Sequence, residues 1–169
     1  MAGDCEIAQH LLDCFDSIYR TLGESAPTLT TDAYVVRVHE MSMALGEVAL
    51  ELRGALDDAS PRPFPLLTAI LDHAVANDET GAMVLFAMAM VVGPRLLVSI
   101  YDAGRALENE TLSAALDRAA QVLVAQIVAT GESARGQAPI EDSSWQLAAR
   151  DLTETLESAG YGESLGISR

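Results

Sequence analysis

The sequence predicts an all-α protein, a multi-helix bundle of about six to seven helices around a central apolar helix. The run Ala82–Val92 has no polar residue on any side, and a helix that is apolar all round must be surrounded by other elements. The segments around it carry apolar residues at spacings of three and four, so each has one apolar face that needs a partner. No segment has the sustained two-residue alternation of a strand.

The length and composition indicate one domain. The chain has 169 residues, half of them apolar, which is enough for one hydrophobic core. We expect residues 1–131 to form the helical bundle and residues 132–142, which are polar with glycine and proline, to form a linker. Residues 143–160 are predicted to be a C-terminal amphipathic helix that packs on the bundle or on a partner copy.

The charge of the chain disfavours several classes of partner. Its net charge is −15, and all ten basic residues are arginine. Such a surface repels phosphate backbones and anionic lipids, so we predict that it binds neither nucleic acid nor membrane. The apolar run before Gly93 is also shorter than the roughly 18 to 20 residues of a membrane span. The acidic N-terminus, without an apolar segment after it, favours a cytoplasmic protein.

The first helix is expected at Asp4–Leu22, with Gly23 as its end. Its two cysteines, Cys5 and Cys14, would lie roughly 13 Å apart on one helix, too far for a disulfide. The inward positions are Ile7, Leu11, Cys14, Phe15, Ile18 and Leu22. Beside them runs a polar row at steps of four, three and four, consisting of Glu6, His10, Asp13 and Ser17.

The second helix, expected at residues 32–59, has two apolar rows. One row has the alternating spacing of a long bundle helix and contains Tyr34, Val38, Met41, Leu45, Val48, Leu52 and Leu56. Nearly opposite lies a second row, Val36, Met43 and Leu50, spaced by sevens. A surface helix with a single apolar face does not need this row. It predicts that the helix is sandwiched, either inside one large bundle or at an interface of a homodimer.

Proline and glycine residues indicate where the remaining helices begin and end. A proline-rich connector at residues 60–65 precedes a short helix that ends at Ala76. In the central segment, residues 79–107, the pair Gly93-Pro94 predicts two helices or one sharply kinked helix. The next helix is expected to begin at Asn109 or Thr111 and to end at Thr130, with Gly131 as its stop. A last helix at residues 143–158 carries Trp145 on its apolar stripe, and the chain from Gly160 on is expected to fray.

The polar row on the first helix offers metal-ligand types, namely Glu6, His10 and Asp13. Carboxylate-bridged metal bundles use Glu-x-x-His pairs, and none of the three histidines has an acid three residues before it. We therefore interpret the row as a solvated polar flank, favour no metal site and expect no cofactor. Cys14 belongs to the core stripe, so its proximity to His10 does not indicate an activated thiol.

A second candidate site is the start of a helix at Gly93-Pro94-Arg95. Free N–H groups there, with Arg95 beside them, would suit a carboxylate or phosphate ligand. Met88 and Phe86 would supply the walls of an apolar pocket. The simpler interpretation is that Gly93-Pro94 forms a tight turn between helices and that Met88 and Phe86 are ordinary core residues.

Two hypotheses about function remain. The first is a non-enzymatic, acidic, α-helical interaction module, homodimeric through Val36, Met43 and Leu50, which binds or regulates a protein partner; Trp145 adds a further contact. The second is a bundle that holds a small apolar or anionic molecule or acts as a small enzyme. It would use His39, His10 or His73 as acid or base and Arg95 as anchor. Convergence of two histidines with Arg95 on one cavity would favour the second hypothesis.

Overall fold

The computed structural model describes residues 3–135 and 143–166, and every regular element in these ranges is helical. This confirms the predicted all-α multi-helix bundle. Four long helical stretches form the body of the bundle: α1 (Asp4–Ser25), α2 (Asp32–Ala55), the run that joins α4 (Ala82–Ala87) to α5 (Gly93–Ala106), and α6 (Glu110–Arg135). Helix α3 (Pro65–Asn77) and helix α7 (Ser143–Ser158) lie outside this body.

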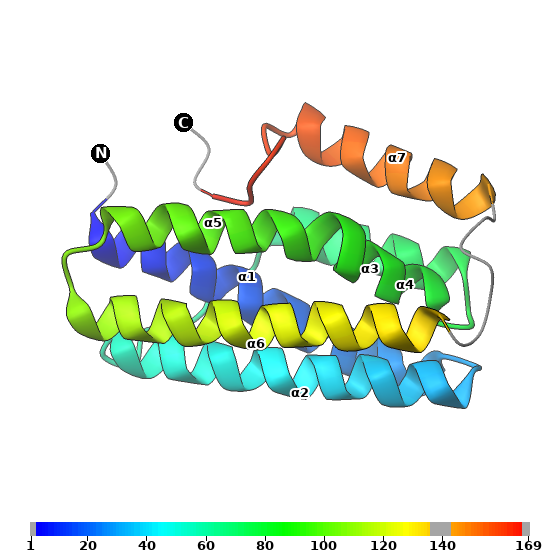
Figure 1. Cartoon of the computed structure of the whole chain (residues 1–169), viewed down its shortest axis with the longest axis horizontal. Coiled ribbons are helices and arrows are strands. Elements are labelled where there is room, and N and C mark those ends of the chain that lie inside the picture. Colours follow the sequence, from blue (N-terminus) through cyan, green and yellow to red (C-terminus); the bar gives the residue numbers. More distant parts are fainter. Residues whose placement is uncertain (1–2, 136–142, 167–169) are drawn as a thin grey trace.

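The four long stretches form a closed ring. Helix α2 contacts α1 on one side and α6 on the other, and α5 contacts both α6 and α1. Helix α6 lies beside α2 along nearly its whole length (Figure 1). Helix α3 contacts α1 and α4.

The core lies inside this ring, at the positions that the helical periodicity predicts. Each of the four stretches contributes large side chains that are almost completely buried. Among them are Leu11, Phe15, Ile18, Met41, Leu45, Leu52, Met88, Leu96, Leu116 and Leu123. The two stripes predicted for the first two helices therefore face each other across the interior.

Of the two alternatives predicted at Gly93-Pro94, the one with two separate helices is wrong, because one helical run extends from Ala82 to Ala106. The irregularity is a π-helical turn, η2 (Met88–Val92), in which the N–H of Gly93 bonds to the carbonyl of Met88, five residues back. Proline has no N–H to donate and crowds the preceding turn of a regular α-helix. A wider turn just before Pro94 relieves this conflict without ending the helix.

Two predicted helix stops are wrong: both helices continue through the glycine, which lowers helix stability by only about 1 kcal/mol relative to alanine. Helix α1 continues through Gly23 to Ser25 and a short 3-10 turn, η1 (Ala26–Thr28). A Cβ at Gly23 would lie 3.1 Å from Oγ of Ser42, so this glycine sits where α1 and α2 approach closely. Helix α6 likewise passes Gly131, and the predicted linker therefore begins inside a helix.

Helix α2 ends earlier than predicted, at Ala55. Asp57 and Asp58, which follow it, both have positive φ, 53° and 61°. This left-handed conformation ends the helix, and aspartate is one of the few residues besides glycine that adopt it readily.

Two helical stretches are long and apolar enough to cross a membrane by length and composition, Ala82–Ala106 and Glu110–Ser133. The first is longer than the apolar run in the sequence indicated, because the helix continues past Gly93. About half of its most apolar window is buried against the other helices of the bundle.

Helix α7 packs on α4 and the π-helical turn, on the outside of the ring (Figure 1). Leu152 and Leu156 of its predicted stripe are buried. The side chain of Trp145 and residues 136–142 lie outside the described residues. The chain beyond α7 was expected to fray. This expectation is wrong for residues 161–166, since Leu165 is completely buried.

Candidate functional site

The outer face of α2 carries an apolar row that no other part of the described chain covers. Val36 is 55% exposed, Met43 48% and Leu50 67%. The predicted alternative in which this row is buried inside one large bundle is therefore wrong. The other predicted alternative, an interface of a homodimer, stays a prediction.

Met43 and Leu50 of this row line a groove between α2 and α1. Its floor is partly aromatic: the ring of Tyr19 lies so close to Gly46 that a Cβ there would be 2.6 Å from Cδ2 of Tyr19. Glycine at this position lets the ring lie directly against the backbone of α2. The residues that line the groove are Leu12, Asp16, Tyr19, Arg20, Met43, Gly46, Glu47, Ala49, Leu50, Arg53 and Pro61.

The charges in this groove are balanced. Two acids, Asp16 and Glu47, accompany two arginines, Arg20 and Arg53. The whole chain has 25 acids and only 10 arginines, so this face is far less negative than the average surface. Asp16 and Arg20 form an ion pair on α1 at 2.7 Å, while Glu47 and Arg53 are exposed on α2.

The polar row on α1 is not the solvated flank that the sequence predicted, because Asp13 and Ser17 are buried. Asp13 is buried and accepts hydrogen bonds from the backbone N–H and the guanidinium of Arg62, at 2.8 and 2.9 Å. Ser17 accepts one from the backbone N–H of Phe64. Both therefore fix the proline-rich connector against α1, while Glu6 is exposed. Among the described residues no three His, Cys, Asp or Glu side chains are grouped to hold a metal ion.

His10, in the same row, contacts the C-terminal segment. Its Nε2 donates to the carbonyl oxygen of Leu165, and its ring packs against that of Phe64 with 5.5 Å between centroids. The thiol of Cys14 lies 3.8 Å from the same nitrogen. Burial, with a smaller effect from the charge of Asp13, raises the pKa of the Cys14 thiol far above its usual range. A thiol held protonated is not a nucleophile.

We expect the two cysteines to differ sharply in reactivity. Cys5 is exposed and Cys14 is buried, and only a thiolate reacts with disulfide reagents. Titration of the native protein with Ellman's reagent at pH 8 should modify Cys5 alone, and a second thiol should react only after guanidinium unfolding. Rapid modification of Cys14 in the Cys5→Ser variant, while helicity is retained, would contradict this.

The other two histidines lie on separate surfaces. His39 is exposed on α2, between Val36 and Met43 of the apolar row. His73 is exposed on α3 and lines a groove beside α7. Each histidine therefore comes from a different helix and has a different environment, and the structure does not bring them together as an acid–base pair.

The predicted ligand site at Gly93 lacks the helix start on which it depends. The N–H of Gly93 is used inside the continuous helix, and a Cβ there would lie 2.9 Å from Cδ1 of Ile127 on α6. Met88 is buried in the core and Phe86 is half-buried. The guanidinium of Arg95 donates to the carbonyl oxygen of Val91. This carbonyl lies in the turn where Pro94 has no N–H to donate.

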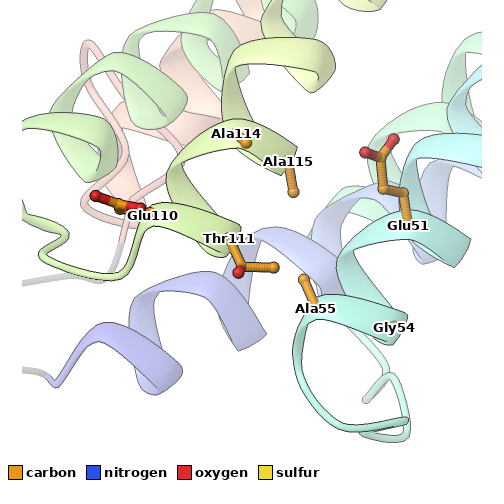
Figure 2. A pocket seen from close by; sticks show the side chains of 7 residues that line it. All are labelled: Glu51, Gly54, Ala55, Glu110, Thr111, Ala114 and Ala115. Atoms are coloured by element: carbon orange, nitrogen blue, oxygen red, sulfur yellow. The ribbon is translucent and has the colours of Figure 1, made fainter.

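A further cleft lies between the end of α2 and the start of α6 (Figure 2). Its lining includes the small side chains of Ala55, Thr111 and Ala115 and the acid Glu51, while the carboxylate of Glu110 points away from α2. Glu51 is paired with Arg118 at 3.3 Å. This combination of small and acidic groups supplies no nucleophile and no anchor for an anion.

Comparison with protein-family models, with curated proteins and with solved structures finds no match to this chain. The groove between α1 and α2 combines exposed apolar side chains with two acids and two arginines. Sequence reasoning identified its apolar row but missed Tyr19 and Arg53. Gly46 and Arg53 follow Met43 and Leu50 by three residues, and this repeating spacing of three and four was the available signal.

Proposed function

We propose that the protein is a non-enzymatic helical interaction module that forms a homodimer through the outer face of α1 and α2. The observation that supports the proposal is the exposed row Val36, Met43 and Leu50 beside a groove of balanced charge. Exposed apolar rows of this regularity are typical of contact surfaces. Of the two hypotheses from the sequence, this one fits the separate positions of the histidines.

The charge pattern favours a second copy as the partner. Two chains of net charge −15 repel each other, and they associate only where the facing surfaces are locally neutral. In a two-fold symmetric contact the same patch meets itself, so Arg20 and Arg53 of one copy face Asp16 and Glu47 of the other. A strongly basic partner would instead be attracted to the more acidic surfaces elsewhere on the chain.

The proposal predicts that Met43→Glu converts the dimer to a monomer. A carboxylate at this position would be buried twice, once from each copy, in the apolar part of the contact. We expect the dissociation constant to rise at least about tenfold, with helicity unchanged because Met43 is 48% exposed in the single chain. Size exclusion with light scattering over a concentration series, together with circular dichroism, measures both effects.

Met90→Glu is the matched control, since Met90 is 62% exposed on a different helix. It should leave the dimer intact; if both variants or neither of them dissociate, the face is not the one proposed.

Exchanging two charges on this face tests whether the contact between the two copies is two-fold symmetric. Arg53→Glu and Glu47→Arg should each weaken self-association, and mixing the two variants should restore a heterodimer. Failure to restore it would remove the argument from charge.

A further inference from the structure

Helices α5 and α6 share a second exposed apolar surface. Val98 and Tyr101 on α5 and Val124 and Val128 on α6 are between 39% and 56% exposed. The two helices pack side by side (Figure 1), and Tyr101 and Val124 line a groove of about 510 Å³ at their junction. We call the surface of these four residues the α5–α6 face. No other segment of the described chain covers it.

The lining of this groove suits a docked α-helix. Besides Tyr101 and Val124, it includes the small side chains of Ala120 and Ala125, which leave room for another helix to approach. Val124 and Val128 are four positions apart and so lie on one side of α6. An amphipathic helix that lays its apolar side into such a groove is a recurring mode of recognition between proteins.

The outer side of α6 is acidic at both ends of this apolar surface. Asp117 and Glu132 are exposed, and they share that side with Val124 and Val128, at spacings of seven, four and four. The distance along the helix between the two acids is roughly 22 Å. Among the described residues that line the groove, Asp117 alone is charged.

The arginines described beside this surface do not neutralise the two acids. Arg118, next to Asp117 in the sequence, pairs with Glu51 of α2 instead. On α5 the exposed Arg105 lies three positions after the exposed Asp102, so these two charges offset each other. The α5–α6 face therefore has an apolar centre with a negative charge at each end, in contrast to the balanced charges of the groove between α1 and α2.

This pattern of charge selects between a second copy and another protein as the partner. In a two-fold contact the α5–α6 face would meet itself, and the carboxylates at its ends would face those of the other copy. Like charges placed opposite each other oppose association, and so does the net charge of −15 on each chain. A basic partner, in contrast, is attracted both to the two ends of the face and to the chain as a whole.

We propose that the α5–α6 face binds an amphipathic helix of another protein, one with an apolar centre and lysine or arginine at both ends. The apolar centre packs against Tyr101, Val124 and Val128. The basic ends, about 15 positions apart, lie beside Asp117 and Glu132. The α1–α2 face belongs to the other two helices of the ring, so both contacts can form on one chain and neither depends on the other.

A designed peptide serves as the probe for this surface. It is a fluorescent helix of about 18 residues, with lysines at both ends and leucines at spacings of three and four between them. We expect one peptide to bind per chain, with a dissociation constant below about 100 μM that rises as salt screens the charges. Fluorescence anisotropy measures the affinity. A peptide of the same composition with leucine at every second position should not bind, since as a helix it has no apolar side.

Paired variants locate the bound peptide. Val124→Ser/Val128→Ser removes apolar surface without adding charge and should weaken binding at least about tenfold. Serine and valine have similar helix propensities, so α6 should keep its helicity; if it does not, Tyr101→Ser on α5 replaces this variant. The matched change on the other face, Val36→Ser/Leu50→Ser, should leave the affinity for the peptide unchanged. Absence of binding to the wild type, or a folded α5–α6 variant that binds as tightly as the wild type, would overturn the proposal.

Reversal of the two acids tests the charge pattern. Asp117→Lys/Glu132→Lys should bind the lysine peptide at least about tenfold more weakly. It should also bind a peptide with glutamates at both ends, which the wild type should not bind. If the preference does not reverse, the peptide is attracted only by the overall negative charge, and the assignment to this face is wrong.

The same variants exclude a second copy as the occupant. Val124→Ser/Val128→Ser should keep the self-association of the wild type in light scattering; loss of self-association would make the face a contact between copies and overturn the proposal. The dimer proposed through the α1–α2 face is tested separately by Met43→Glu. That variant should bind the lysine peptide with the affinity of the wild type whether or not the dimer exists.

Discussion

The Gly93→Ala variant is expected to unfold at a markedly lower denaturant concentration than the wild type. A Cβ at this position would lie 2.5 Å from the carbonyl oxygen of Met88 and 2.9 Å from Cδ1 of Ile127. The side chain of Ile127 has rotamers available to it, but the carbonyl of Met88 is part of the π-helical turn and cannot move without disturbing it. We expect a loss of about 2 kcal/mol in the free energy of unfolding, since overpacking outweighs the helix preference of alanine.

The control for this variant lies in the same helix. A Cβ at Gly104 would meet nothing within 4 Å. Gly104→Ala should therefore raise the free energy of unfolding by up to about 1 kcal/mol, because only the helix preference of alanine contributes. Guanidinium unfolding followed by circular dichroism gives both values. Equal effects at Gly93 and Gly104 would show that close packing between α5 and α6 does not require the first glycine.

Asp13→Ala is expected to have an effect of similar size through polar contacts. The carboxylate of Asp13, whose side chain is 8% exposed, accepts hydrogen bonds from Gln9 and from the backbone and side chain of Arg62. Alanine leaves the backbone N–H of Arg62 without its acceptor and frees the connector from α1. Hydrogen bonds to charged groups contribute about 1.5 to 3 kcal/mol, so we expect a loss of about 2 to 3 kcal/mol.

Asp16→Ala provides a matched comparison on the same helix. Asp16 also pairs with an arginine, but the side chain of Arg20 is 64% exposed and no connector depends on the contact. Surface pairs of this kind contribute less than about 1 kcal/mol. The loss in the free energy of unfolding, measured by thermal and denaturant unfolding, should therefore be clearly larger for Asp13→Ala than for Asp16→Ala. A loss as large for Asp16 as for Asp13 would mean that the buried network around the connector is not what stabilises this region.

The helices and their buried faces could be predicted because local spacing determines which side of a helix is apolar. Several helix ends could not, since the glycines at positions 23 and 131 do not stop their helices. The bounds of the last helix, residues 143–158, were predicted correctly. At Gly23 the close approach of α2 continues the helix, and this contact is tertiary. Aspartate favours turns and tolerates the left-handed conformation, so the pair Asp57-Asp58 was a signal that the predicted end of the second helix overlooked.

The α1–α2 face and the segment after α7 show the same contrast. The row of Val36, Met43 and Leu50 has a period, so its place opposite the core stripe followed from the sequence, whereas its exposure in the single chain did not. Tyr19 joins that face only because α1 packs against α2 at Gly46. Leu165 is one apolar residue among glycine, serine and glutamate, and a single residue has no period. Its burial depends on His10 and Arg95, which precede it by 155 and 70 positions.

The π-helical turn amounts to one extra residue in an otherwise regular helix. Leu96 and Ile100, both buried, follow the buried Met88 by eight and twelve positions, whereas seven and eleven would keep one face of a straight α-helix. The wider turn absorbs the difference and returns both halves to the core. A homologous chain with a regular helix here would therefore align with this one only if a single-residue gap is placed within residues 88–92. An alignment that forbids gaps inside helices would shift every position on one side of that turn.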